Sequence, residues 1–379
     1  MARIIYGQQV TDKSGLKIRE DDLPAFFAQA RAYNQRLLKA GRKVAYFFID
    51  PLLFSFEAGN RFYFKVLQTP RIDKLNYYRS GAGPIHALSD ARQLIDHHLY
   101  DAVFIFGFEP LLTGKKIYGS AALSRAMDIF NGPNLLSCYN GLAVAICRKY
   151  GLAKEDFLTL ADLLYRNYCH TYEGIDQKQL TEARPRGRFM EDRGAPLFRI
   201  TDCANPNLDF AGGIIVANNE AADLLAIANQ RQLDIISVQH AMVEADPEDL
   251  SKISGGELFP HLSHIFTELK QESGIDLCAE SAAVMLDAYT CYPPIPLAFL
   301  ICGGFMETPR QLEEVLAARD ITINGGLSLA GAPWNNPVLS SLVSMYEKLP
   351  AARAHWGLVH GNGGIGEAQG LALLQKVLV

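Results

Sequence analysis

Apolar positions along this chain follow two patterns, a helical spacing and short continuous runs, which together predict a layered α/β protein. We expect a strand at residues 3–6, a helix at 23–39 and a second strand at 44–49. Strand, helix and strand in this order are typical of an α/β layer. The other expected elements are strands at 102–107, 231–243 and 284–289, and helices at 135–150, 154–170, 259–273 and 310–319.

Two stretches that lie far apart in the sequence predict the same order of parts. Residues 78–109 contain a glycine turn, a helix that begins near Pro84 and an apolar strand. Residues 324–364 contain a glycine turn, a helix that begins at Pro337, an apolar strand at 355–360 and a second glycine turn. This repetition indicates two homologous halves. Each half would present a helix N-terminus, which attracts anions through its free N–H groups, to a common centre.

The stretch 324–364 is the main candidate for a site, because glycine lets backbone N–H groups come close to a ligand. His360 ends the apolar run at the second turn, where a histidine can act as a base near neutral pH. The alternative is a core histidine hydrogen-bonded to a turn carbonyl. Asn335, Asn336 and Asn362 could direct amides at a carbonyl group, but helix capping and turn formation explain such residues equally well.

Two other segments leave alternatives open. The aromatic segment at 51–76 fits an extended arm at a dimer interface or an irregular surface loop packed by its own rings. The run Arg184, Arg186, Arg188 and Arg193 fits a solvated surface or a loop that contacts phosphate. Neither choice is decided by the sequence.

Composition narrows the class of protein. The 379 residues allow two domains or one duplicated α/β unit, and 49% hydrophobic with 20% charged residues is ordinary for a soluble globular protein. A net charge of -5 argues against nucleic acid or an anionic membrane as the main partner. The longest apolar runs fall short of the ~18 residues that a spanning helix needs. The seven cysteines lack metal-site spacing and the start MARIIYGQQV lacks a signal peptide, so we expect reduced thiols, no metal site and a cytoplasmic protein.

Several segments, taken in order, resemble the thiolase superfamily, nearest its sterol-carrier-type, acetyl-CoA acetyltransferase-like branch. The segments are SGAGPIHALSDARQLIDHHLYDAVFIFGFE, YGLAKEDFLTLADLLYRNY and LFRITDCANPNLDFAGGIIVANNEAA. The spacing from NGG at 324–326 to GAP at 331–333 is similar to that of the family's NGG…GHP motif, and HGNGG at 360–364 resembles its last glycine turn. The resemblance covers nearly the whole chain.

The resemblance implies an α/β fold of two duplicated αβαβα halves in a five-layer sandwich with a helical loop domain. The N-terminal half would span residues 1–215, with the loop domain at about 111–190, and the C-terminal half would span 216–379. A homodimer, a role in lipid metabolism and a CoA thioester substrate without a bound cofactor are also implied.

The catalytic positions of the family differ in this chain. Thiolases condense acyl groups through an acyl-cysteine, which needs a thiolate at a helix N-terminus. Tyr78 stands at the position of that cysteine, Ala332 at the histidine of GHP and His360 at the second cysteine. Because a phenol with a pKa near ~10 is little ionised at neutral pH, we do not expect the standard route. Tyr78 would be a general acid, an oxyanion donor or a filler of the vacated pocket.

The resemblance also implies roles for other residues. Tyr289 and Cys291 belong to the segment that matches an oxyanion loop, and Cys291 is expected to be a buried structural thiol rather than the nucleophile. Gly326, Gly363 and Gly364 would supply backbone N–H groups for substrate binding, beside the three asparagines named above.

Two functional hypotheses follow. The first is an acyl-CoA-directed enzyme with altered chemistry, an acyltransferase or a carbon–carbon lyase of retro-aldol type, in which Tyr78 and His360 would handle a proton. The second is a non-catalytic thiolase-like subunit that binds an acyl chain or a catalytic partner. A small OB-fold protein is the partner that the resemblance suggests.

Overall fold

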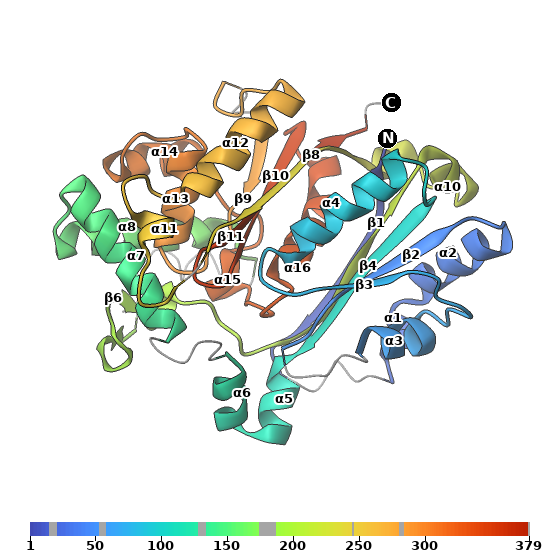
Figure 1. The fold of residues 1–379 in the computed structure, drawn as a ribbon, viewed down its shortest axis with the longest axis horizontal. Coiled ribbons are helices and arrows are strands. Elements are labelled where there is room, and N and C mark those ends of the chain that lie inside the picture. The colour runs from blue at the N-terminus through green and yellow to red at the C-terminus, as the bar shows by residue number, and fades with distance from the viewer. Residues whose placement is uncertain are drawn as a thin grey trace.

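The chain is organised around one large mixed sheet (Figure 1). The computed structural model describes residues 1–14, 21–52, 58–127, 134–173, 187–244, 246–279 and 284–377. The sheet has nine strands in the order β3-β2-β4-β7-β1-β8-β11-β10-β9. The sheet consists of two halves that are joined by a short antiparallel pairing of β1 with β8. In this pairing Arg3 lies opposite Asp234 and Ile4 lies opposite Leu233.

The N-terminal half of the sheet combines parallel and antiparallel pairs. Its strands are β1 (Arg3–Asp12), β2 (Val44–Ile49), β3 (Leu75–Tyr78), β4 (Ala102–Pro110) and β7 (Asp209–Ala217). Strand β2 runs parallel to β3 and β4, whereas β7 lies antiparallel between β4 and β1. The helices of this half on the outer side are α1 (Leu23–Phe26), α2 (Ala28–Lys39), α3 (Ala58–Arg61) with a π-helix at Phe62–Val66, and α10 (Asn219–Leu224).

The C-terminal half repeats this arrangement with one strand fewer. Its strands are β8 (Leu233–Met242), β9 (Val284–Asp287), β10 (Trp356–Gly363) and β11 (Ala368–Lys376). Strand β9 runs parallel to β10, and β11 lies antiparallel between β10 and β8. Besides a helix of the central layer that is described below, the helices of this half are α11 (Ser251–Ser254), α12 (Pro260–Ser273), α13 (Pro294–Cys302), α14 (Leu312–Ala318) and α15 (Gly326–Leu329).

Two helices, α4 (Gly83–Asp96) and α16 (Pro337–Lys348), lie between the two halves of the sheet (Figure 1). Both pack on strands of each half and on one another. Their buried side chains include Ile85, Leu88 and Ile95 on α4 and Val338 and Leu342 on α16. With α12 on one outer face and α2 and α3 on the other, the order of layers is αβαβα. The predicted fold class is therefore confirmed.

A helical region lies between β4 and β7 in the chain. It contains α5 (Leu111–Tyr118), α6 (Ser120–Met127), α7 (Leu135–Tyr150), α8 (Lys154–Thr171), β5 (Phe189–Met190) and β6 (Ala195–Arg199). Helix α7 packs on α13 and α8 packs on α14, so these two helices are attached to the C-terminal half, whereas α5 packs on β7 of the N-terminal half. The expected division after residue 215 falls within β7 and stays a prediction. No helix in the described ranges is long and apolar enough to cross a membrane.

Two of the sequence predictions for the first part of the chain need correction. The helix expected at 23–39 is broken at Phe27 into α1 and α2. The segment at 51–76 was predicted to be an arm or a surface loop, but from residue 58 it forms α3, the π-helix and the start of β3. Its Tyr63 is fully buried and donates a hydrogen bond to the Phe47 carbonyl at 2.6 Å. Phe62 and Tyr63 belong to the core, whereas Phe64 is 50% exposed, and residues 53–57 lie outside the described part.

Candidate functional site

The glycine turn before α4 packs directly on the glycine-rich end of β10. A Cβ atom on Gly81 would lie 2.1 Å from the Asn362 carbonyl oxygen and 2.5 Å from the Tyr289 hydroxyl. A Cβ atom on Gly363 would lie 2.5 Å from Ser80 Oγ. The sequence predicts that the heads of the two repeated helices face a common centre, and the structure places the turn before α4 against the glycine-rich end of β10. The glycines let two segments of the chain pack closely on one another. Their meeting point, formed by Ser80, Gly81, Tyr289, Asn362 and Gly363 and called the turn junction, is therefore filled by protein atoms.

The backbone at the head of α4 is hydrogen-bonded within the protein. Ser80 has a φ of 113°, a strained value for a serine. Its N–H donates to Asn335 Oδ1 at 3.1 Å, and its own Oγ accepts from the Ala82 N–H at 3.2 Å. The Gly83 N–H donates to the Ser80 carbonyl at 2.9 Å. These three N–H groups are therefore occupied and do not form an open site for an oxyanion.

Gly326 and Asn335 hold the second turn in the same manner. Gly326 begins α15 with a φ of 67°, and a Cβ atom there would lie 2.4 Å from Thr290 Oγ1. Asn335 Nδ2 donates to the Asp50 carbonyl at 2.7 Å, in addition to the bond that Oδ1 accepts from Ser80. The Asn335 amide thus joins the head of α16 to the turn before α4 and to the end of β2.

His360 lies within β10 rather than at its end, opposite Leu371 of β11. Its Nδ1 accepts from the Tyr289 N–H at 3.3 Å, so Nε2 carries the proton and donates to Gln369 Oε1 at 2.8 Å. The ring stacks on Phe299 with centroids 4.8 Å apart. Burial lowers the pKa of His360 to about 4. Both ring nitrogens are bonded and the ring is neutral, as in a core histidine, although the partners are the Tyr289 N–H and the Gln369 side chain rather than a turn carbonyl. Its catalytic role stays a prediction.

The polar partners of His360 continue into a buried chain of hydrogen bonds. Gln369 Nε2 donates to Asn362 Oδ1 at 2.6 Å, and Asn362 Nδ2 donates to the Tyr139 hydroxyl at 2.8 Å. That hydroxyl donates in turn to the Gly364 carbonyl at 2.8 Å. Because Asn362 is satisfied at both ends, its side chain is not free to bind a substrate carbonyl.

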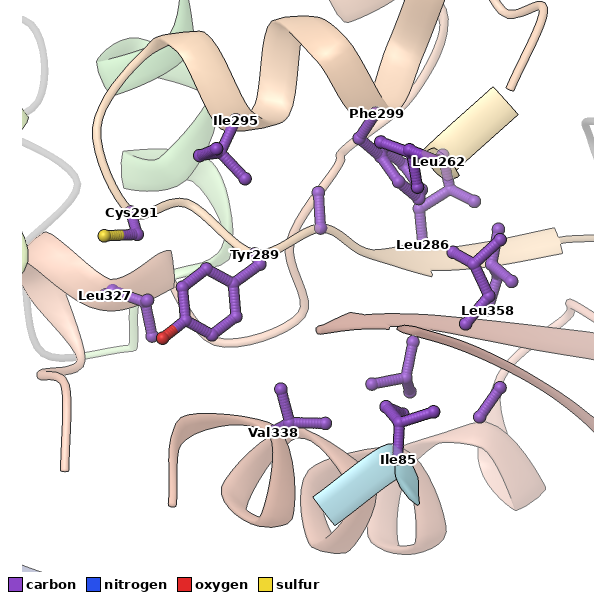
Figure 2. Close-up of a cluster of buried hydrophobic side chains, with 14 of the residues drawn as sticks. Ile85, Leu262, Leu286, Tyr289, Cys291, Ile295, Phe299, Leu327, Val338 and Leu358 are labelled. Carbon is purple, nitrogen blue, oxygen red and sulfur yellow. The ribbon is translucent and has the colours of Figure 1, made fainter. Parts of the chain in front are cut away.

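Tyr289 and Cys291 occupy the space beside this chain of hydrogen bonds. Figure 2 shows the hydroxyl end of Tyr289 next to Leu327, with Val338 across from the ring and Cys291 on the far side of Leu327. Burial raises the pKa of the Cys291 thiol well above its ordinary value, and it does the same for the Tyr289 phenol. Cys291 is therefore a neutral thiol in the core, as a structural residue would be.

Tyr78 makes contacts that are separate from those of His360 and Cys291. It is the last residue of β3, and its hydroxyl donates to Asp90 Oδ2 on α4 at 2.7 Å. Its ring packs on Phe47 and on His86, with centroids 5.2 and 5.3 Å away. Burial raises the pKa of Tyr78, and the bond to Asp90 raises it further. The structure thus does not assemble Tyr78, His360 and Cys291 around one shared cavity.

Glu109, which lies beside the head of α16, was not among the residues predicted from the sequence. Glu109 and its neighbour Asn336 are both fully buried. Asn336 was a candidate to direct its amide at a carbonyl or to cap a helix. It is the N-cap residue of α16 but makes no side-chain cap hydrogen bond, and its amide lies against Gly107 of β4, where a Cβ atom would be 1.8 Å from Oδ1; a binding role stays a prediction. The signal for Glu109 was present in the sequence, as one carboxylate directly after the apolar run AVFIFGF.

Two cavities adjoin α16, and the four predicted catalytic side chains line neither. The first has a volume of about 750 Å³ and is lined by Leu327, Gly331 and Pro333 together with polar side chains of β1 and α16. The second, of about 850 Å³, lies between α2, β1 and the end of α16. Ala332, at the position of the family's histidine, is buried, and its N–H donates to the Asn205 carbonyl at 2.8 Å.

The basic run is described only in part. Arg184 and Arg186 lie outside the described residues. Arg188 is exposed and pairs with Asp192 at 3.2 Å, whereas Arg193 is exposed in the turn before β6. A contact with phosphate stays a prediction. All seven cysteines are free thiols, and the described ranges contain no cluster of three His, Cys, Asp or Glu side chains that could hold a metal ion.

Comparison with solved structures identifies the architecture. An SCP2-thiolase-like protein type 1 from Mycobacterium smegmatis, described as monomeric, matches with a TM-score of 0.71 at 16% identity, over 100% of this chain and 78% of that one. Acetyl-CoA acetyltransferase from Syntrophomonas wolfei matches with a TM-score of 0.63 at 13% identity, over 99% of both chains. An Ltp2-ChsH2(DUF35) aldolase matches with a TM-score of 0.66 at 14% identity, over 99% of this chain and 98% of that one.

These matches are structural only. No protein-family profile and no curated protein sequence matches the chain. At 13% to 16% identity, the solved structures establish the arrangement of strands and helices rather than the chemistry. The protein has a thiolase-like fold.

Proposed function

We propose that this protein is a non-catalytic thiolase-like subunit that works with a catalytic partner in acyl-CoA metabolism. The observation that carries the proposal is the filled turn junction, where Gly81 and Gly363 pack on Asn362, Tyr289 and Ser80. A substrate carbonyl would need the volume that these groups occupy. The role is one of binding rather than of bond formation.

The chemistry of the residues supports the same conclusion. Acyl transfer of the thiolase type needs a thiolate, a base and a set of free N–H donors. At the head of α4 the chain has Tyr78, bonded to Asp90, and the N–H groups of Ser80 and Gly83 are occupied. His360 is neutral, with both ring nitrogens bonded. Each of the three requirements is therefore unmet in this conformation.

An activity assay tests the proposal directly. Purified protein is offered 3-ketoacyl-CoA with free CoA, acetyl-CoA alone, and a 3-hydroxyacyl-CoA, with an active thiolase as the positive control. We expect no CoA release or consumption above that of heat-denatured protein. Turnover that is lost in His360→Asn or Tyr78→Phe, while circular dichroism shows an intact fold, would overturn the proposal.

The partner is tested by assembly. One of the similar structures is titled as an aldolase of Ltp2 with a DUF35 protein, and a small OB-fold protein is the partner that we propose for this chain. Co-expression with such proteins from the same organism, followed by size-exclusion chromatography with light scattering, should give a defined complex. Elution only as a homodimer or monomer with every candidate would argue against the partner-binding role.

An acyl-CoA-directed enzyme is the second candidate, because the 750 Å³ cavity reaches Gly331 and Pro333 on either side of Ala332. In that case an acyl or pantetheine group would enter beside α16. Isothermal titration with CoA, acetyl-CoA and a long-chain acyl-CoA separates the alternatives. Tight binding together with turnover favours the enzyme, whereas binding without turnover favours the subunit.

A further inference from the structure

A carboxyl group that forms no ion pair with a described residue lies beside the head of α16, near the turn junction. Glu109, in β4, is 0% exposed, and its Oε1 accepts a hydrogen bond from the Leu52 N–H at 2.9 Å. Within the described part of the chain, Oε2 is buried and has no hydrogen-bond partner. A buried carboxylate in this condition is costly, because the charge loses its hydration and has no cationic partner among the described residues to offset the loss.

Asn336, at the head of α16, lies beside this carboxyl group. Its side chain is 0% exposed, and neither Oδ1 nor Nδ2 has a hydrogen-bond partner among the described residues. The amide lies against Gly107, which shares a face of β4 with Glu109 because side chains of a strand alternate. Asn336 Nδ2 can donate to a Glu109 oxygen in either protonation state, so the atom left without a donor in this buried place is Asn336 Oδ1.

The charged groups around Glu109 add to the cost of ionisation. Burial is the main cause that raises the pKa of Glu109 to about 8, and the neighbouring Asp50 carboxylate raises it further. The groups that favour ionisation are the Leu52 and Asn335 backbones and the Asn336 side chain. Asp50 in turn faces the largely exposed Arg79, whose Nε lies 3.5 Å from Asp50 Oδ2.

We propose that Glu109 is held as a neutral carboxylic acid whose hydroxyl donates to Asn336 Oδ1, and that this proton fastens the head of α16 to the end of β4. A protonated carboxyl supplies the donor that Asn336 Oδ1 lacks, while a Glu109 oxygen accepts from Asn336 Nδ2. Ionisation removes the donor and places a second negative charge beside Asp50. The proton thus acts as a pH-dependent fastener between the two halves of the protein.

Ionisation of Glu109 would affect the turn junction through Asn335. Its amide joins the Ser80 N–H to the Asp50 carbonyl, and its backbone adjoins Glu109. Loss of the bond to Asn336 therefore loosens the turn that closes the junction. This inference is independent of the proposed function, because it concerns only how the junction is held.

The sign of the pH effect follows from linkage. The native state binds a proton that the unfolded chain, with an ordinary glutamate, has already released above about pH 4.5. The contribution of protonated Glu109 to the free energy of unfolding is thus fully present below that pH. It is lost as the pH rises towards about 8, the pKa of Glu109 in the folded protein. Over that window, one proton changes the unfolding constant by about tenfold per pH unit.

The experiment compares urea unfolding of three proteins from pH 5 to pH 9. They are the wild type, Glu109→Gln, which keeps a donor and an acceptor without charge, and Glu314→Gln, a control at an exposed glutamate of α14. The ratio of the wild-type unfolding constant to that of Glu109→Gln should rise about tenfold per pH unit between pH 5 and pH 8. The control should follow the wild type. A pH-independent ratio for Glu109→Gln would overturn the proposal.

A measurement on the wild type alone covers the case in which Glu109→Gln does not fold. Hydrogen–deuterium exchange, corrected for the intrinsic effect of pH, is compared at pH 6.5 and pH 9 for peptides that contain residues 107–110 and 335–340. Protection should fall at pH 9 in both peptides together, and not in the core of α12. Equal protection at the two pH values would contradict the fastener.

Discussion

Asn362 of β10 donates a hydrogen bond from Nδ2 to the Tyr139 hydroxyl of α7 at 2.8 Å, and both residues are buried. The bond joins the helical region to the C-terminal half of the sheet at the place where a substrate carbonyl would be expected. It belongs to a chain of bonds in which His360, Gln369 and the Gly364 carbonyl also take part. The polar groups of the junction thus serve the fold.

Removal of the Tyr139 hydroxyl should destabilise the protein. In Tyr139→Phe, Asn362 Nδ2 loses its acceptor and the Gly364 carbonyl loses its donor, which costs roughly 1–3 kcal/mol when the groups stay buried. Urea unfolding monitored by circular dichroism measures the change, with Tyr118→Phe as the control, because Tyr118 is 55% exposed. Equal stability of Tyr139→Phe and the wild type would show that water replaces the lost bonds.

His360 should make the protein sensitive to acid. Its pKa of about 4 in the folded state lies below the ordinary 6.5, so the unfolded chain binds a proton first as the pH falls. The stability is present above pH 6.5 and is lost as pH falls towards 4, by about 3 kcal/mol in total. Between pH 4 and pH 7.5, the free energy of unfolding should therefore change less with pH for His360→Gln than for the wild type. An equal change in the two proteins would mean that His360 binds its proton equally well in the folded and the unfolded protein.

The layered architecture could be predicted because its signals are local. Helix α16 follows from the spacing of Val338, Leu342 and Tyr346 after Pro337, and α7 follows from its own apolar spacing. Strand β11 and helix α13 were missed. The run PIPLAFLIC is apolar throughout and buried on all sides, so periodicity cannot separate a helix from a strand there.

The interior of the site could not be predicted, because it depends on which distant groups meet. That Gly81 faces Asn362 and Tyr289 follows from the packing of α4 on β10 and not from either sequence segment. His360 was expected at a strand end, since the apolar run stops there. The strand instead continues to Gly363, because Gln369 of β11 supplies the partner that keeps the imidazole in the core.

A methyl group at Gly81 should be far more harmful than one at Gly83. In Gly81→Ala the new Cβ meets backbone and phenol oxygens at 2.1 and 2.5 Å, whereas in Gly83→Ala the nearest atoms are 3.6 Å away. Overpacking of this kind costs about 1–3 kcal/mol, while alanine in the first turn of a helix is favourable. Thermal unfolding of the two variants makes a matched comparison two residues apart. Equal melting temperatures would mean that the junction is open in solution.

Cys291 should resist alkylation in the native protein. Iodoacetamide reacts with the thiolate, and burial raises the pKa of the Cys291 thiol far above neutral pH. After brief treatment at pH 7.5, mass spectrometry of tryptic peptides should find Cys291 unmodified, with full modification once the protein is unfolded in guanidinium chloride. Cys147 and Cys278, which are partly exposed, serve as internal references. Rapid native alkylation of Cys291, accompanied by loss of any CoA-dependent activity, would restore a cysteine-based mechanism and displace the non-catalytic role.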